Sequence, residues 1–394
     1  MSTATATGMS TFPYPGLRPY EKSEADLFFG REEHVDQLLA KLERHRFLAV
    51  IGLSGCGKSS LVRAGLLAVV ESGFMPRAGL NWRAAVMRPG GQPLANLASA
   101  LLAPDGLDRR MDNPQEDLAF LGAILRRGPL GLVEAFRDAG LPERTNLLVL
   151  VDQFEEIFRY HRLGGTSEAN AFVDLLLTSA AESSAPIYVV LTMRSDHLGN
   201  CTVFRDLPEA MNDSQFLTPR LTRDQNRAAI VGPAKMFGVE VQPDVVTRIL
   251  NEMGTDPDQL PLMQHLLMRM WRRATQGRVE RDFGGQITMT MEDYEAVGGL
   301  ANALSDHVER IYQRLPDAAC KRIAETAFRN LTEITPDGQV VRRPVRLSEI
   351  CAVADASAEQ VVPVLDEFRA EGRSFLVPPI SEPLNPEKVI DISH

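Results

Sequence analysis

The run from Gly52 to Ser59 reads Gly-Leu-Ser-Gly-Cys-Gly-Lys-Ser and has the residue types and spacing that hold phosphate groups. Its glycines let successive backbone N–H groups turn inward, and the helix expected after it presents a positive end to the same anion. A glycine-rich turn that binds no ligand is the alternative. We predict phosphate contacts from this phosphate loop and the next residue, namely Gly52, Ser54, Gly55, Cys56, Gly57, Lys58, Ser59 and Ser60.

Two side chains of the loop have distinct predicted roles. The Lys58 ammonium neutralises the β- and γ-phosphates, and the Ser59 hydroxyl holds Mg²⁺. A second metal-binding residue follows the apolar stretch 146–151, where Asp152 comes directly after an expected buried strand. It then lies at the carboxyl edge of the sheet and holds Mg²⁺ through water. Capping of a helix is the alternative for Asp152.

The residues after Asp152 bear on catalysis, because many hydrolysing ATPases place a second acid there to orient the attacking water. Gln153 occupies that place here, and Glu155 and Glu156 follow it. We predict that one of these two glutamates serves as the catalytic acid, with a surface helix as an equal alternative. The sequence therefore supports nucleotide binding more firmly than fast hydrolysis.

Arg194 follows another apolar stretch, 187–191, and is expected at the same edge of the sheet. A guanidinium group makes strong, directional bonds to phosphate. We therefore predict that Arg194 contacts the γ-phosphate and distinguishes ATP from ADP. A structural ion pair with Asp196 or a nearby glutamate is the alternative.

The elements that must position these residues are short apolar stretches separated by segments of helical pattern. None of the stretches alternates with polar residues, as expected of strands covered on both faces. A parallel sheet with helices on both faces follows, the α/β class of P-loop proteins. The predicted strands are 47–51, 84–87, 147–151, 187–191 and 216–218.

Beyond Pro219 the pattern becomes helical, and it ends in short extended pieces that suggest a winged helix. The expected order is a P-loop sheet, a small helical domain and a winged-helix domain. Predicted boundaries are 1–28 for an N-terminal leader, 29–219 for the nucleotide-binding domain, 220–290 for the helical domain and 291–394 for the winged-helix domain.

Composition excludes several classes of protein. The 394 residues include 42 Lys plus Arg against 52 Asp plus Glu, a net charge of −10, so we do not expect nucleic acid as a partner. The four cysteines are far apart, which suggests neither a zinc site nor disulfides. The sequence has no apolar run of membrane-spanning length and no secretory signal pattern, so we expect a cytoplasmic protein.

Several motifs in order resemble the novel STAND branch of signal-transduction P-loop ATPases. The resemblance begins with Tyr-Pro-Gly-Leu-Arg-Pro-Tyr at 14–20 and Asp-Leu-Phe-Phe-Gly-Arg-Glu at 26–32, and it includes the phosphate loop and Asp-Gln-Phe-Glu-Glu at 152–156. It continues through Gly-Pro-Ala at 232–234, Leu-Pro-Leu-Met-Gln-His at 260–265, Tyr294 with Gly-Gly-Leu at 298–300, and Arg-Arg at 342–343. It covers essentially residues 12–394.

This resemblance implies a switch related to the NB-ARC proteins, in which the three domains close over ADP. It implies that Gly30 and Arg31 lie near the adenine and that Pro261 stacks by the base, although Gln259 stands where the family has glycine. It also implies that His394 contacts the β-phosphate. We expect this chain to be part of a longer protein whose C-terminal sensor repeats are absent here.

Three functions remain open at this point. The leading hypothesis is a switch that binds ATP or ADP with Mg²⁺, hydrolyses ATP slowly and forms homo-oligomers when a signal opens it. One alternative is a turnover ATPase of the AAA+ type. The other is a DNA-binding regulator, suggested by the arginines near a possible wing, which are Arg342, Arg343, Arg346 and Arg373.

Overall fold

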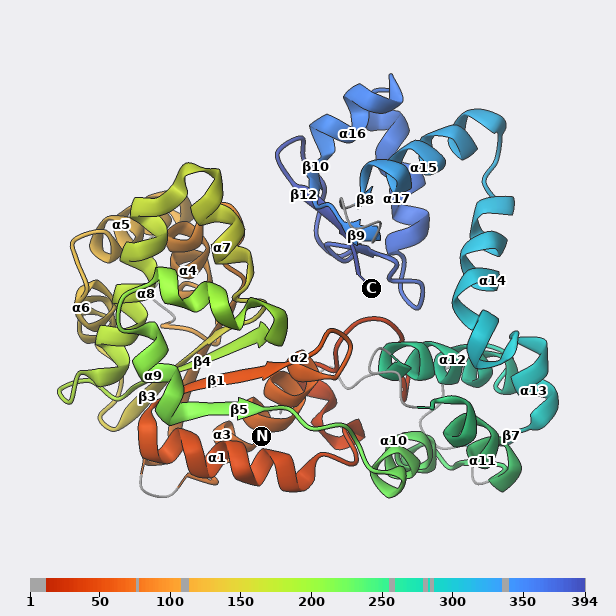
Figure 1. Ribbon diagram of the computed structural model, residues 1–394, viewed down its shortest axis with the longest axis horizontal. Coiled ribbons are helices and arrows are strands. Elements are labelled where there is room, and N and C mark those ends of the chain that lie inside the picture. Colours follow the sequence, from red (N-terminus) through yellow and green to blue (C-terminus); the bar gives the residue numbers. More distant parts are fainter. Residues whose placement is uncertain are drawn as a thin grey trace, which may run out of the picture. The chain divides into compact units, whose positions relative to one another are not determined.

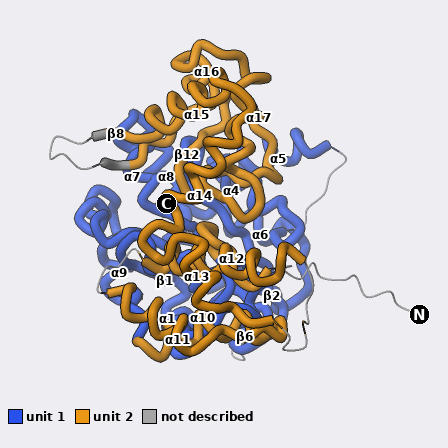
Figure 2. The backbone as a smooth tube through the Cα atoms, turned by 90° about the vertical axis from the view of Figure 1, so that its right-hand side faces the viewer, with its two compact units in different colours: residues 1–8, 20–222 blue, residues 9–19, 223–394 orange. Residues whose placement is uncertain are grey.

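The computed structural model of the protein describes residues 12–75, 78–107, 113–254, 259–278, 283, 287–334 and 340–393. These residues divide into two units (Figure 2). The first unit contains residues 20–222, and the second contains residues 12–19 together with 223–393. The chain thus passes between the units twice, at residues 19–20 and at residues 222–223.

A five-stranded parallel sheet lies at the centre of the first unit (Figure 1). The strand order is β2-β3-β4-β1-β5. The strands are β1 (Phe47–Gly52), β2 (Asn81–Met87), β3 (Thr145–Val151), β4 (Ile187–Arg194) and β5 (Gln215–Leu217). All five predicted strands are present, and the predicted P-loop fold class is confirmed.

Helices cover both faces of this sheet, and the side chains of each strand point alternately to the two faces. In β3, Leu147 and Val149 join the core under α4 (Pro93–Leu101), α6 (Gly131–Asp138) and α8 (Thr166–Ala181). Leu148 and Leu150 join the opposite core, under α1 (Glu32–His45), η2 (Leu61–Leu67) and α3 (Ala68–Glu71). Burial on both faces explains why the three central strands, β1, β3 and β4, are almost entirely apolar.

Shorter elements of the first unit connect and flank the sheet. They are η1 (Lys22–Leu27), α2 (Lys58–Ser60), α5 (Pro114–Leu125), α7 (Glu156–Tyr160), η3 (His161–Gly165), η4 (Ser195–Val203) and α9 (Leu207–Ser214). Three of them begin at or directly after predicted site residues, because the carboxyl end of each central strand leads into a helical turn. These are α2 after β1, α7 after β3 and η4 after β4.

The second unit begins with a helical part. It comprises α10 (Arg223–Met236), α11 (Pro243–Glu252), α12 (Gln259–Ala274), α13 (Met291–Ala296) and α14 (Gly299–Gln313). A parallel pair of short strands, β6 (Val239–Val241) and β7 (Ile287–Met289), was not predicted. The N-terminal segment packs here, since the Tyr14 ring lies edge-on to Trp271 and Leu17 belongs to the core of this unit.

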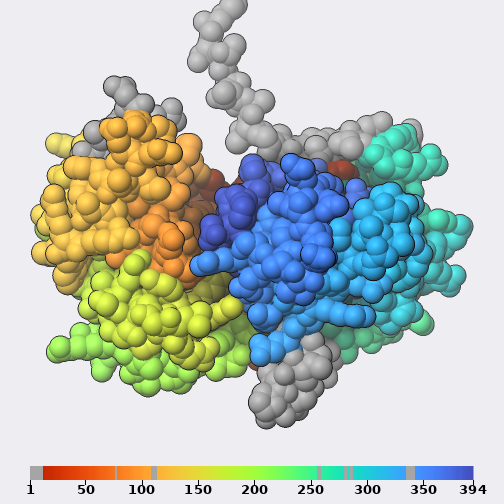
Figure 3. All heavy atoms as spheres, turned by 90° about the horizontal axis from the view of Figure 1, so that it is seen from above, coloured from red at the N-terminus to blue at the C-terminus, as the bar shows by residue number. Residues whose placement is uncertain are grey.

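The last part of the second unit combines helices with small antiparallel sheets. Its helices are α15 (Ala318–Asn330), α16 (Leu347–Ala354) and α17 (Ala358–Arg369). Strand β12 (Val389–Ile392) lies between β10 (Val345–Arg346) and β11 (Leu376–Val377), and β8 (Thr332–Ile334) pairs with β9 (Val340–Arg342). Figure 3 shows the surface of this part in shades of blue. In the described residues, no helix is long and apolar enough to cross a membrane.

Candidate nucleotide-binding site

The phosphate loop turns sharply between β1 and α2, and its glycines are required by that geometry. Gly55 and Gly57 have φ angles of 68° and 90°, in the left-handed region that favours glycine. A Cβ atom on Gly52 would lie only 2.7 Å from Cys56 Sγ. The backbone conformation therefore favours glycine at 55 and 57, and any side chain at position 52 would force Cys56 to move.

The Lys58 side chain folds back over the phosphate loop. Its Nζ donates hydrogen bonds to the carbonyl oxygens of Gly52 and Leu53, at 2.9 and 2.7 Å. Cys56 is buried, whereas Ser54, Gly55 and Gly57 are only partly buried. The ammonium group thus lies at the loop, where a phosphate oxygen can replace the carbonyl oxygens as its partner.

Asp152 is fully buried at the carboxyl end of β3, and three side chains bind its carboxylate. Ser59 Oγ donates to Oδ1 at 2.8 Å, and Thr192 Oγ1 donates to the same oxygen at 2.6 Å. Arg63 Nη2 donates to Oδ2 at 2.9 Å. The predicted neighbours Ser59 and Asp152 therefore meet at one point, which we call the metal corner (Ser59, Arg63, Asp152 and Thr192).

The charge of Asp152 is maintained despite its burial. Burial raises the pKa of its carboxyl, but Arg63, Arg88 and the two hydroxyl hydrogen bonds outweigh this effect and hold the pKa below its ordinary value. The metal corner thus joins an ionised carboxylate to a hydroxyl oxygen, and oxygen ligands are those that Mg²⁺ prefers. These residues fit the metal predicted from the sequence.

Arg31 lies beside the loop and is nearly fully buried, at 2% exposure. Its Nη2 donates to the carbonyl oxygen of Cys56 at 2.8 Å, and its Nη1 donates to that of Pro219 at 2.7 Å. Burial lowers the pKa of Arg31 to about 10. Arg31 therefore connects the phosphate loop to the chain that leaves β5, while its predicted place near the adenine stays a prediction.

Gly30 and Ser60 have partners close to the loop as well. Gly30 has a φ angle of 85°, and its N–H donates to Glu32 Oε1 at 2.9 Å. Ser60 Oγ accepts a hydrogen bond from the backbone N–H of Tyr20 at 3.1 Å. Ser60 thus binds the N-terminal segment in this structure, and its contact with phosphate stays a prediction.

The turn after Asp152 carries two acids in unusual surroundings. Gln153 adopts a left-handed φ of 57°, and its N–H donates to Thr192 Oγ1 at 2.9 Å. Burial raises the pKa of Glu155, and its Oε2 atom is buried with no hydrogen-bond partner. Burial also raises the pKa of Glu156 to about 7, although Oε2 accepts a hydrogen bond from the Gly90 N–H at 2.9 Å. We call Glu155 and Glu156 the acidic turn.

Arg194 lies at the end of β4, paired in register with Gly52 at the start of the phosphate loop. Its Nε and Nη2 atoms bind the two carboxylate oxygens of Asp196 at 3.0 and 2.6 Å. The structure therefore contains the ion pair that was the alternative to a γ-phosphate contact. Since this pair is partly exposed to solvent, a phosphate can compete with Asp196 for the guanidinium.

The two remaining predicted site residues belong to the second unit. Pro261 lies in the first turn of α12, where a proline costs no intrahelical hydrogen bond. His394 lies outside the described residues. Their predicted contacts with base and β-phosphate therefore stay predictions.

Sequence reasoning missed Arg63 and Thr192, which complete the metal corner. Arg63 follows Ser59 by four residues, so both lie on one face of the helix. That spacing is a signal that could have pointed to Arg63. Thr192 carries no such signal, because its role arises from the neighbouring positions of β3 and β4 in the sheet.

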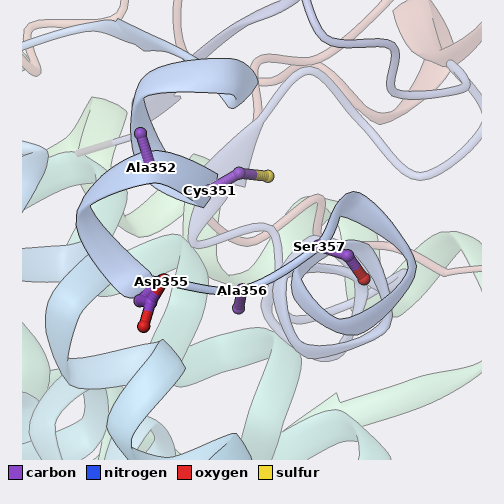
Figure 4. A pocket seen from close by; sticks show the side chains of 5 residues that line it. All are labelled: Cys351, Ala352, Asp355, Ala356 and Ser357. Atoms are coloured by element: carbon purple, nitrogen blue, oxygen red, sulfur yellow. The ribbon is translucent and has the colours of Figure 1, made fainter.

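Two surface pockets lie apart from the phosphate loop. One, of about 410 Å³, lies at the connection between α16 and α17 and is lined by Cys351, Ala352, Asp355, Ala356 and Ser357 (Figure 4). The other, of about 380 Å³, is lined by Glu71, Leu80, Asn81, Trp82, Arg83, Asp105, Pro142 and Thr145. Neither is lined by a predicted site residue.

Several solved structures are similar to this chain at low sequence identity. The Aeropyrum pernix ORC1 protein in complex with DNA is 15% identical, with 94% of this chain and 91% of that chain covered and a TM-score of 0.49. The Aeropyrum pernix ORC2 protein in ADPNP–ADP complexes is 11% identical, with 92% of this chain and 88% of that chain covered and a TM-score of 0.48. The Walker-type ATPase PABY2304 of Pyrococcus abyssi is 15% identical, with 96% of each chain covered and a TM-score of 0.45. No curated protein matches the sequence.

A family profile matches the sequence over nearly its whole length. The family is described as Novel STAND NTPase 1, and the match spans residues 13–394. This span contains the phosphate loop, the metal corner and the motifs on which the family was predicted. The chain belongs to the Novel STAND NTPase 1 family.

Proposed function

We propose that this protein is a signal-transduction switch that binds ATP or ADP with Mg²⁺ and hydrolyses ATP slowly. The metal corner carries the proposal, because Ser59 Oγ lies 2.8 Å from an ionised, fully buried Asp152 directly after the phosphate loop. Lys58 and the backbone N–H groups of the loop bind the phosphates, and Ser59 and Asp152 hold the metal. When bound, Mg²⁺ neutralises charge on the phosphate oxygens.

The switch itself is inferred from the family resemblance. In this proposal ADP holds the nucleotide-binding, helical and winged-helix domains closed, and ATP favours an open form that assembles into homo-oligomers. The order β10-β12-β11, combined with α15, α16 and α17, supports a winged helix at the C-terminal end. Each nucleotide must bind one form more tightly, since a ligand with equal affinity for both shifts nothing.

Slow hydrolysis is supported by the residue after Asp152. Gln153 carries no charge with which to activate water, and its backbone is held in a left-handed conformation. The Arg194 guanidinium is bound to Asp196 rather than held free for the γ-phosphate. Both features favour retention of a nucleotide over its turnover.

One observation favours a turnover ATPase as the second candidate. Glu155 Oε2 is buried without a partner, and the nearby Lys58 charge favours its ionised form. A carboxylate with a free oxygen at this place is able to orient an attacking water. A Glu155→Gln variant separates the candidates, because only a turnover ATPase predicts rapid hydrolysis that this variant stops.

The DNA-binding alternative is not proposed, because each arginine that suggested it has an acidic partner. Arg342 lies near Asp391, Arg343 near Glu349, Arg346 near Glu387 and Arg373 near Glu367. These ion pairs neutralise the charges that would contact a DNA backbone. The expectation that nucleic acid is not a partner stays a prediction.

Calorimetry with Mg-ADP and Mg-ATP tests the proposed function. We expect Lys58→Ala to abolish measurable binding of both nucleotides, because a direct charge on the phosphates is removed. Lys235→Ala is the matched control, since this lysine is exposed on α10 in the other unit. Equal affinities in Lys58→Ala and the unaltered protein would refute the assignment of the phosphate loop.

A further inference from the structure

Arg63 joins two carboxylates that come from distant parts of the sequence. Its Nη2 atom binds Asp152 Oδ2 at 2.9 Å, and its Nη1 atom binds Glu21 Oε1 at 2.7 Å. The Arg63 side chain is only 16% exposed, Asp152 is fully buried, and Glu21 is 46% exposed. A planar guanidinium group can bind two carboxylates through separate nitrogen atoms, whereas a lysine ammonium has only one nitrogen atom.

The position of Arg63 matters for a metal ion at the metal corner. Ser59, the predicted metal ligand, lies one helical turn before Arg63, and both bind the carboxylate of Asp152. Mg²⁺ at the Ser59 hydroxyl therefore meets a carboxylate whose negative charge is already balanced by a guanidinium. Two positive charges near one buried carboxylate repel each other, and the low local dielectric strengthens this repulsion.

Glu21 reduces the repulsion between the Arg63 guanidinium and a metal ion, because it draws the guanidinium toward a second negative charge. Its segment is held on the first unit, where the Tyr20 N–H donates to Ser60 Oγ at 3.1 Å and the Glu21 N–H donates to Glu24 Oε2 at 2.9 Å. Residues 12–19, directly before it, belong to the second unit. Glu21 is thus close to one of the two places where the chain passes between the units.

We propose that Arg63 is a positioning residue that competes with Mg²⁺ for the Asp152 carboxylate, and that Glu21 weakens this competition by binding the same guanidinium group. The inference rests on the proposed function and adds to it a control of metal affinity by the N-terminal segment. It predicts changes of opposite sign for the two residues. Loss of Arg63 tightens metal binding, whereas loss of the Glu21 charge weakens it.

The test is a titration of the ADP-bound protein with Mn²⁺, in which electron paramagnetic resonance measures the concentration of the free ion. We expect Arg63→Met, which keeps the volume of the side chain, to lower the Kd for Mn²⁺ by about tenfold. We expect Glu21→Gln to raise this Kd several-fold in the unaltered background and to leave it unchanged in Arg63→Met. Arg63→Lys keeps the charge but loses the bridge, so it should behave like Glu21→Gln.

Lys22→Gln is the matched control, because Lys22 pairs with Glu71 and Asp105 and has no contact with Asp152. Thermal melting of each variant verifies that it is folded, and Arg63→Gln, which also removes the charge, replaces Arg63→Met in this comparison if Arg63→Met unfolds. Weaker Mn²⁺ binding in both Arg63→Met and Glu21→Gln, or no change in either, would overturn the inference. Failure of the unaltered protein to bind ADP would instead overturn the proposed function on which this inference rests.

Discussion

Asp152 of the metal corner and the two glutamates of the acidic turn are close in sequence, yet their carboxylates have opposite surroundings. Asp152 binds two hydroxyl groups and a guanidinium, which hold its pKa below the ordinary value. Glu155 and Glu156 are half-buried and have fewer partners, so partial burial raises the pKa of each. The difference supports the proposal that this sheet edge holds a metal and a nucleotide more readily than it activates water.

The largest expected effect comes from removal of the Asp152 charge. Asp152→Asn should lower the free energy of unfolding by about 3 to 5 kcal/mol, because the buried Arg63 guanidinium loses its main partner. Denaturant unfolding measures this value. Asp196→Asn is the control, since its ion pair with Arg194 is half exposed and should contribute about 1 kcal/mol or less. Similar losses in both variants would remove the contrast between the two sites.

Glu156→Gln should act in the opposite direction and depend on pH. The pKa of Glu156 is about 7 in the folded protein against an ordinary 4.5, so ionisation of this group costs stability. The cost is absent below pH 4.5, grows as the pH rises from 4.5 to about 7, and is constant above that value. The variant should therefore be more stable by about 3 kcal/mol at pH 8 and by nothing at pH 4. A gain in stability that is the same at both pH values would contradict the raised pKa of Glu156.

Arg194→Ala tests whether the ion pair with Asp196 gives way to a nucleotide. A charge-assisted bond to the γ-phosphate contributes about 1.5 to 3 kcal/mol, so the variant should bind ATP about 10- to 100-fold more weakly and ADP almost unchanged. Calorimetry with both nucleotides measures the ratio. Arg205→Ala is the control, because Arg205 also pairs with an acid nearby, Asp206, but is almost fully exposed. Equal losses for ATP and ADP would make Arg194 a structural residue.

The smallest effect is expected at His394, whose family role is a hydrogen bond to the β-phosphate. His394→Ala should weaken ADP by about 0.5 to 1.5 kcal/mol, the size of one neutral hydrogen bond. It should also reduce the protection that ADP gives against limited proteolysis. Identical protection with and without the imidazole would show that the contact is not made.

The central sheet could be predicted because strands buried on both faces leave a strong signal in sequence. Each predicted apolar stretch became a strand, and each predicted acid or arginine at a strand end lies at the expected edge. The strands β6 and β7 could not be predicted in this way. They have three residues each, and their pairing joins positions almost fifty residues apart.

The candidate site was predictable only as far as its motifs extend. Gly52 to Ser59 and Asp152 follow known spacings, so their meeting at one point could be expected. The Glu21–Arg63 bridge has no spacing that would reveal it, because residues from a segment before α1 and a helix after β1 are brought together only by packing. The raised pKa of Glu156 likewise depends on burial, which a sequence does not give.

The most direct test of the account is a single-turnover experiment on the purified protein with radiolabelled ATP and Mg²⁺, together with measurement of retained ADP. The assembled metal corner and the incomplete acidic turn predict firmly bound ADP and a hydrolysis rate well below the roughly 1 to 10³ s⁻¹ of ordinary enzymes. Rapid hydrolysis that is lost in Glu155→Gln would contradict the account, because the acidic turn would then activate water as a working ATPase does.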